Sequence, residues 1–313
     1  MSELDNQWEK EVIIKLLTDS QKEQRTARRW KIAFRFIYIG LLLLFLIVLP
    51  IVMSIGKISE MTSDHVAVVN LSGTIDSEND NASFLLAGME NAYKNPSVKA
   101  IILRANSPGG SPVISGIAYD EIIALKKKNS SIPVYVVVED VCASGCYYIA
   151  SAADKIYANQ ASLVGSIGVI SGGFGFDKAI EKLGIERRLK TAGANKGMGD
   201  PFSPENPAQA EIWQELLNEI HQQFIAAVKN GRGAALKDKN DPDIFSGRVY
   251  TGSQGVKNGL VDGLGSVRSV ARDTVKLPTV NYTLEPKGLA KYLGKGIRGE
   301  IKQSFDSLTQ VGW

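Results

Sequence analysis

The order of apolar and polar residues along the chain predicts an α/β domain that follows one long apolar segment. From residue 65 onward, short β-type runs alternate with stretches whose apolar residues recur at helical spacing. Because parallel strands need a crossover connection, this alternation predicts a layered domain with largely parallel strand pairing. The predicted strands cover residues 66–71, 98–104, 133–138, 155–158, 162–170 and 186–190, and the predicted helices cover 83–95, 113–128, 175–183, 206–230 and 266–275.

The long apolar segment, residues 36–55, contains no charged residue. About 20 such residues match a hydrocarbon core roughly 30 Å thick at about 1.5 Å per helical residue. A cleaved signal peptide has a shorter apolar region of ~7–15 residues, nearer the start of the chain. We therefore predict an uncleaved membrane anchor, in which Pro50 can be tolerated.

The charges beside this segment predict its orientation. Five cationic residues precede it, whereas Lys57 on the other side is offset by Glu60 and Asp64. The positive-inside rule then places the N-terminus in the cytoplasm and the chain after Lys57 outside it. The predicted organisation is a cytoplasmic segment (1–35), a transmembrane helix (36–55), a linker (56–64), a domain (65–275) and a C-terminal tail (276–313).

The composition of the chain argues against nucleic-acid binding and against a zinc site. A net charge of +3 over 313 residues is too small to indicate nucleic-acid binding, and no basic block is interleaved with aromatic residues. The two cysteines, Cys142 and Cys146, lack nearby histidines and do not make a zinc site. On a helix their spacing is a poor disulfide geometry, so we expect small buried packing residues and leave a redox role open.

The two histidines are poorly placed for catalysis. His65 opens a predicted strand, and His221 lies in a predicted amphipathic helix. A Ser-His-Asp triad is therefore not expected, and a serine nucleophile would need another base.

Three motifs could carry chemistry. Ser144 follows a predicted strand at a small-residue turn, which can expose a hydroxyl and aim the first N–H groups of a helix at a ligand. The alternative is an ordinary turn with an N-cap serine. The Pro-Gly-Gly turn within Asn106–Gly110 can bring backbone N–H groups close to a ligand. Lys196 lies in a loop rich in small residues.

In this order and spacing the motifs resemble the signal peptide peptidase A family of membrane-anchored Ser-Lys peptidases. The resemblance covers roughly residues 65–275 and includes the anchor. In short members of the family the lysine stands 52 positions after the serine, and here 196 − 144 = 52. The matching motifs are Ser-Pro-Gly-Gly at 107–110, Ala-Ser-Gly at 143–145 followed by Tyr-Tyr-Ile-Ala at 147–150, Ala-Asp-Lys-Ile-Tyr-Ala at 153–158, Gly-Ser-Ile-Gly-Val at 165–169, and Lys196.

The resemblance implies a role for each matching residue. Ser144 would attack the peptide carbonyl, Lys196 would take its proton, and Ser166 would orient the lysine. The backbone N–H groups of Gly110 and Gly145 would form the oxyanion hole. A free lysine, with a pKa of about 10.4, is a poor base at neutral pH, but shielding from water favours its neutral amine. The Gly, Ala and Met neighbours of the loop lysine suit such shielding.

The resemblance also implies an architecture and a place of action. It implies a crotonase/Clp-protease-like fold of repeated β-β-α-type units and a ring-shaped homo-oligomer, in which a neighbouring subunit can complete a site. The protein would lie in the bacterial inner membrane as a single-pass protein with its catalytic domain on the extracytoplasmic side. It would cleave hydrophobic peptides such as released signal peptides, with no metal, nucleotide or organic cofactor.

Two alternatives and one departure accompany this interpretation. A non-catalytic membrane-anchored scaffold or quality-control adaptor of the same fold is disfavoured by the intact Ser144 and Lys196. A crotonase-like acyl-CoA enzyme is disfavoured because an export-side domain has little access to CoA. Cys146 stands where many relatives carry Gly, which puts the shape of the pocket in question.

Overall fold

The computed structural model describes residues 28, 30–31, 34–49, 61–237 and 241–284, in two units, Met1–Ser63 and Asp64–Trp313. In the first unit, residues 34–49 are helical and their side chains are exposed. Within the described residues we find no helix whose length and apolar character suffice to cross a bilayer. Residues 50–55 of the predicted anchor lie outside the described residues, as do most of 1–35 and of the linker.

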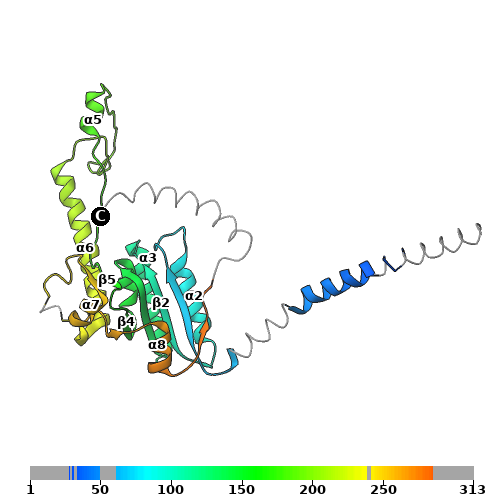
Figure 1. Ribbon diagram of the computed structural model, residues 1–313. Helices are drawn as coiled ribbons and strands as arrows, with labels where there is room; N and C mark the ends of the chain where they lie inside the picture. Colours follow the sequence, from blue (N-terminus) through cyan, green and yellow to red (C-terminus); the bar gives the residue numbers. More distant parts are fainter. Residues whose placement is uncertain (1–27, 29, 32–33, 50–60, 238–240, 285–313) are drawn as a thin grey trace, which may run out of the picture. The chain divides into compact units, whose positions relative to one another are not determined.

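The second unit is built on one largely parallel sheet (Figure 1). Its strand order is β6-β5-β3-β2-β1-β8, and β4 pairs with β3 and β7. Strands β5 and β6 pair antiparallel, whereas the other strand pairs in the described part of the chain are parallel. The predicted α/β class is thereby confirmed. The strands are β1 (His65–Ser72), β2 (Val98–Ser107), β3 (Val134–Ala143), β4 (Lys155–Ala158), β5 (Leu163–Gly165), β6 (Val249–Thr251), β7 (Gly263–Leu264) and β8 (Thr279–Asn281).

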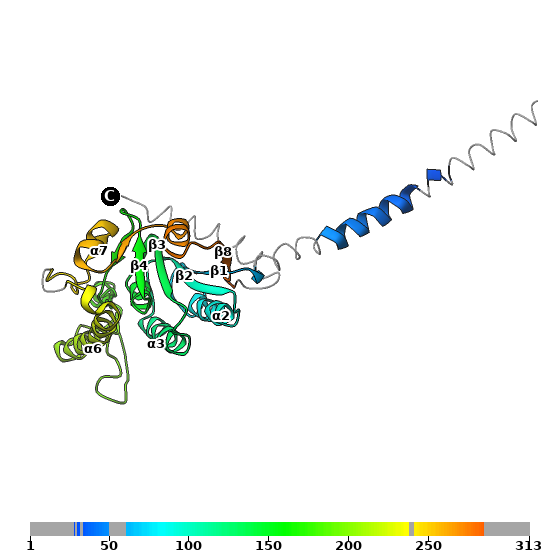
Figure 2. The same cartoon turned by 90° about the horizontal axis from the view of Figure 1, so that it is seen from below.

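Helices cover both faces of this sheet. Figure 2 shows α2, α3 and α6 on one face, with the C-terminal helical segment on the other. The helical elements are α2 (Asn81–Tyr93), α3 (Pro112–Lys128), α4 (Gly145–Ala150), α5 (Asp177–Lys182), α6 (Pro207–Arg232), η1 (Gly233–Ala235), α7 (Gly252–Asn258), α8 (Val267–Ser269) and the π-helical turn η3 (Val270–Val275).

Strand β1 illustrates how the sequence fills both layers. Successive side chains of a strand point to opposite faces, so a strand covered on both faces is apolar throughout. Val66 and Val68 pack with Val270 of η3 in the smaller core cluster. Ala67 and Val69 lie in the main cluster, on the face covered by α2, α3 and α6.

Two predicted strands differ from the structure. The run 162–170 forms a strand only as far as Gly165, because Ser166 takes a φ of 51° and its N–H donates to the carbonyl of Arg248. The run 186–190 forms no strand. There Arg187 pairs instead with Asp200, across a loop connection.

Strand β8 lies within residues 276–313, which the sequence placed in an appended tail. Thr279–Asn281 pairs in parallel with Val66–Val68. The following Tyr282 is buried, and its hydroxyl lies 3.0 Å from Nε2 of His65 and accepts a 2.7 Å hydrogen bond from Asn95. The sheet therefore continues past residue 275, and the domain boundary moves beyond Tyr282. Residues 285–313 lie outside the described part.

Candidate active site

Ser144 lies in the turn that joins β3 to α4. Strand β3 runs between β2 and β5, so the turn emerges from the middle of the sheet. Ser144 takes φ 52° and ψ −126°, a conformation that a residue other than glycine rarely adopts. Its N–H donates to the carbonyl of Gly165 at 2.9 Å, and the residue is half-buried. The strand-to-helix turn predicted at this serine is confirmed.

The Pro-Gly-Gly turn after β2 packs directly against this serine turn. Gly109 has a φ of 102°, and a Cβ placed on it would lie 2.8 Å from both the nitrogen of Gly145 and the Cβ of Ser144. A side chain at position 109 would therefore collide with the serine turn. The glycine in this position allows the two loops to lie in backbone contact.

Two backbone N–H groups lie beside each other at this contact. A Cβ placed on Gly145 would lie 3.2 Å from the nitrogen of Gly110. The parallel bridge between Ile75 and Gly110 uses the carbonyl of Gly109 and the N–H of Ser111, and it does not use the N–H of Gly110. Gly145 is the first residue of α4, where an N–H has no acceptor within the helix. The structure thus brings together both predicted oxyanion donors and the predicted nucleophile.

Ser166 also belongs to this neighbourhood. Its predecessor Gly165 stands opposite Ala143 in the β3–β5 pair and accepts the hydrogen bond from Ser144. The φ of 51° at Ser166 turns the chain out of the sheet here. Ser166 is half-buried and directly follows Gly165, the hydrogen-bond partner of Ser144.

Lys196 lies on a different part of the unit, in a segment that we call the arm, residues 168–206. Figure 1 shows the arm, with α5 within it, drawn out beyond the sheet at the start of α6. Lys196 is exposed, and its N–H donates to Gly193 at 3.1 Å. Within the described part of the chain, no hydrogen bond joins Lys196 to Ser144 or to Ser166. The shielding expected around this lysine is therefore not provided by its own chain.

The arm carries exposed apolar side chains. Ile170 is 97% exposed, Phe174 is 80% exposed and Leu183 is 74% exposed. The loop that follows Lys196 is held by polar contacts. The carboxylate of Asp200 accepts hydrogen bonds from Ser203 and Arg187. These hydrogen bonds hold the pKa of Asp200 below its ordinary value of 3.8, and the bond from Ser203 has the largest effect.

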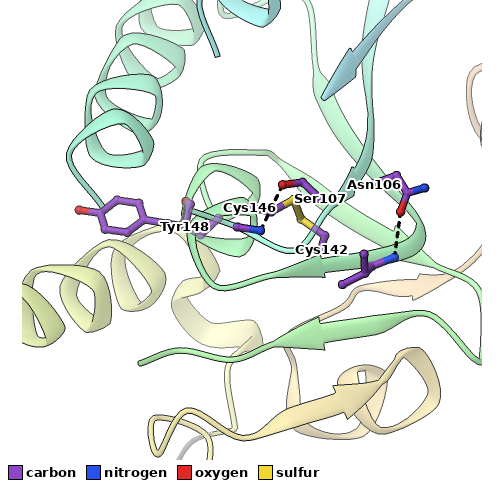
Figure 3. Close-up of a disulfide and its surroundings, with 8 residues drawn as sticks. Asn106, Ser107, Cys142, Cys146 and Tyr148 are labelled. Atoms are coloured by element: carbon purple, nitrogen blue, oxygen red, sulfur yellow. Dashed lines mark hydrogen bonds between the residues drawn. A yellow bond between two sulfur atoms is a disulfide. The ribbon is translucent and has the colours of Figure 1, made fainter. Parts of the chain in front are cut away.

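Cys142 and Cys146 form a disulfide (Figure 3), which corrects the expectation of two separate packing residues. The two residues do not share a helix, because Cys142 belongs to β3 and Cys146 to α4. The chain reverses at Ser144 between them and brings their Cα atoms to 5.1 Å, within the usual disulfide range. Both cysteines have 0% exposure, so the expected burial is confirmed.

Sequence reasoning missed two serines that support the site. Ser107 is fully buried, and its hydroxyl accepts a 3.1 Å hydrogen bond from the N–H of Gly109 (Figure 3). Ser115 of α3 is fully buried as well, and its hydroxyl occupies the place where a side chain on Gly145 would lie. The position of Ser107 at the start of the Ser-Pro-Gly-Gly motif was the available signal. No pattern pointed to Ser115.

The remaining conspicuous side chains have structural partners. His221 lies 3.0 Å from the carbonyl of Ile167. Tyr147 is fully buried and donates to the carbonyl of Leu260 at 2.7 Å, and burial raises the pKa of its hydroxyl. Tyr148 stacks on Phe224 of α6 with ring centroids 4.8 Å apart. These contacts make both tyrosines packing residues of the main core cluster.

The model of peptidase family S49 matches residues 126–281. A Na(+)/H(+) antiporter NhaA of Brucella abortus is 41% identical over 230 residues, which cover 67% of this chain and 31% of the relative. A signal peptide peptidase SppA of Enterococcus faecium is 33% identical over 188 residues, which cover 60% of this chain and 54% of the relative.

A third relative matches along most of its length. It is a protein of Methanocaldococcus jannaschii that is named as a protease, and it is 31% identical over 249 residues, which cover 76% of this chain and 78% of the relative. By contrast, this chain spans about a third of the Brucella relative and about half of the Enterococcus one. The family match and the near full-length relative together identify the family. The chain therefore belongs to peptidase family S49, a family of serine peptidases.

Proposed function

We propose that this protein is an endopeptidase in which Ser144 is the nucleophile and Lys196 the general base. The observation that carries the proposal is the contact between two turns, which places Ser144 beside the N–H groups of Gly110 and Gly145. A serine held in an unusual backbone conformation next to the backbone N–H groups of two glycines suits acyl transfer. The proposal also assigns the α/β domain to the crotonase/Clp-protease-like fold.

The reaction follows from these groups. The neutral amine of Lys196 accepts the proton of the Ser144 hydroxyl as its oxygen bonds to the peptide carbonyl carbon. The carbonyl oxygen becomes an oxyanion that accepts hydrogen bonds from Gly110 and Gly145. The C–N bond then breaks, the amine leaves with the proton from Lys196, and water hydrolyses the acyl-enzyme. Removing one oxyanion donor typically costs about 10²–10³-fold in rate.

The base that serves Ser144 comes, in this proposal, from a neighbouring copy of the chain. Two observations support it: Lys196 is exposed on the arm, and the arm presents Ile170, Phe174 and Leu183 to solvent. Packing of the arm against a second copy in a ring-shaped homo-oligomer would cover these apolar side chains and shield the lysine. Shielding favours the neutral amine that general-base catalysis requires.

The substrates proposed are hydrophobic peptides such as released signal peptides. One relative is named a signal peptide peptidase, and residues 36–55 have the composition of a membrane anchor. The proposed placement is a single pass through the bacterial inner membrane, with the N-terminus in the cytoplasm and the peptidase domain outside it. The antiporter name of the Brucella relative is not carried over, because this chain covers 31% of that protein.

The test mixes two inactive variants. Ser144→Ala keeps the lysine and Lys196→Ala keeps the serine, so each homogeneous assembly lacks one catalytic group. If a site combines residues of two copies, co-assembled variants recover roughly a quarter of wild-type cleavage of a hydrophobic reporter peptide, because mixed neighbours form statistically. Recovery near zero would place both groups in one copy. Retained cleavage by pure Ser144→Ala would refute the nucleophile.

A further inference from the structure

We propose that the Cys142–Cys146 disulfide is a positioning device for the peptidase site, so that the rate of acylation depends on the oxidation state of this pair. The inference rests on the proposed function, because it takes Ser144 as the nucleophile. It assigns a role to Cys142 and Cys146, which lie on either side of the proposed nucleophile. The sequence predicted them to be separate packing residues, whereas the structure joins them in a disulfide.

The disulfide connects a rigid element to a short one. Cys142 stands in the middle of the sheet, paired with Ser107 of β2 on one side and Val164 of β5 on the other. Cys146 belongs to the first turn of α4, a helix of six residues. The covalent link closes a ring of five residues, 142–146, and both Ser144 and Gly145 lie inside it. The nucleophile and one oxyanion donor are thus held in one small covalent ring.

The backbone inside this ring needs restraint. A residue in the conformation of Ser144 stays there only when its surroundings impose it. The hydrogen bond to Gly165 and the contact with Gly109 supply part of that restraint. The disulfide adds a link that fixes the distance across the turn. A displacement of about 1 Å at a reacting group can cost around 100-fold in rate, so loosening this turn should be visible in catalysis.

The rest of α4 is held by contacts other than the disulfide, so we expect loss of the disulfide to affect only the turn around Ser144. Tyr147 donates to the carbonyl of Leu260, and Tyr148 stacks on Phe224 and lies edge-on to Tyr119. Figure 3 shows Tyr148 pointing away from the disulfide toward the helices. None of these contacts involves a sulfur atom of the pair. We therefore expect the reduced protein to keep its fold and to lose reactivity at Ser144.

The oxidation is an ordinary thiol–disulfide exchange. The two thiols lose two electrons and two protons, and the disulfide of a protein thiol oxidant takes them up and becomes two thiols. Such oxidants act outside the reducing cytoplasm. Both sulfurs are fully buried in the folded unit, so exchange is easiest before β3 and α4 pack. A copy that has not been exported would then remain a slow enzyme.

The experiment uses the full-length protein in its assembled form and compares three states. These are the oxidised wild type, the wild type reduced with dithiothreitol, and the double variant Cys142→Ala/Cys146→Ala. Thiols are counted by alkylation and mass. The readouts are kcat and KM for a hydrophobic reporter peptide, the rate constant for labelling of Ser144 by a fluorophosphonate, and the fraction of sites labelled at the end point.

We expect kcat and the labelling rate constant to fall about 10- to 100-fold on reduction, with KM within twofold and the labelled fraction unchanged. Oxidised glutathione should restore the reduced wild type. The double variant should be slow in both conditions, and its indifference to dithiothreitol controls for other effects of the reductant.

Each other outcome is decisive. Equal rate constants in all three states, with Ser144 still labelled, would overturn the inference and leave the proposed function standing. A smaller labelled fraction with an unchanged rate constant per site would show a purely structural disulfide, and that also overturns it. An oxidised protein that is not labelled at Ser144 would overturn the proposed function, and the inference with it.

Discussion

The conformation of Ser144 has an energetic cost. Its φ of 52° and ψ of −126° are readily reached by glycine and strained for other residues by about 1–3 kcal/mol. Ser166, at φ 51°, is a second serine with positive φ close by in the same sheet region. In the described part of the chain Asp80 and Lys276 also have positive φ, away from these two serines. The positive φ at Ser144 and Ser166 coincides with the positions where we propose the chemistry.

Replacing Ser144 by glycine should therefore stabilise the protein while removing the nucleophile. We expect Ser144→Gly to raise the free energy of unfolding by about 1 kcal/mol relative to Ser144→Ala, even after the added freedom of glycine in the unfolded chain. Urea denaturation measures this as a higher midpoint at unchanged m-value. The alanine variant is the matched control, because it also lacks the hydroxyl but keeps the Cβ. Equal midpoints for the two variants would mean that the turn is not strained.

At the scale of single residues, local patterns located the turn that holds Ser144 but missed the disulfide across it. Small residues after a strand marked Ser144, and Pro-Gly-Gly marked the facing turn. The spacing of Cys142 and Cys146 was judged as if both lay on a helix. The disulfide depends on a chain reversal at a residue with positive φ, and a serine gives no sign of that conformation in a sequence.

At the scale of elements, the carboxylate of Asp200 stabilises part of the arm through its hydrogen bonds. The pKa of Asp200 is lowered mainly by the hydrogen bond from Ser203 and then by that from Arg187. A carboxylate with a lowered pKa contributes stability that is present above its ordinary value of 3.8 and is lost as the pH falls through its lower, folded-state value. These hydrogen bonds therefore stabilise the loop beside Lys196 at neutral pH and weaken as Asp200 is protonated in acid.

Removing the hydroxyl of Ser203 should move this transition. We expect Ser203→Ala to raise the pKa of Asp200 toward 3.8, and Ser203→Thr, which keeps a hydroxyl, to leave it nearly as low as in the wild type. Carboxyl-carbon NMR of aspartate-labelled protein measures the titration, with Asp200→Asn identifying the signal. A pKa that is the same in all three proteins would exclude the hydroxyl as the main cause.

Sequence patterns predicted regular elements better than irregular ones. The helix over 206–230 and the strand over 98–104, which contains the apolar run 100–103, were predicted from the sequence and are confirmed by α6 and β2. The prediction of a strand over 186–190 was wrong, because Arg187 pairs with Asp200 across a loop and the run joins no sheet. The position of Lys196 away from Ser144 could not be read from spacing, which says nothing about how loops project.

At the scale of the whole domain, β8 should be indispensable for stability. A chain ending at Lys276 loses the pairing with β1 and the buried Tyr282, whereas one ending at Leu284 keeps both. We expect the shorter chain to lose roughly 3–5 kcal/mol of unfolding free energy, the usual cost of removing a large buried aromatic side chain. Urea denaturation of the two truncated proteins gives the difference. Identical midpoints would return residues 277–284 to the tail that the sequence predicted.

The pairing of β1 with β8 has a consequence for synthesis. Among the described residues, β1 is the first strand to leave the ribosome, and β8, which covers its outer edge, follows more than 200 residues later. At about 5–20 residues per second, that edge stays open for roughly 10–40 s. An apolar strand with an open edge invites pairing with other chains. The nascent domain therefore passes through a period in which a chaperone, or the export machinery, has to keep its first strand apart from its neighbours.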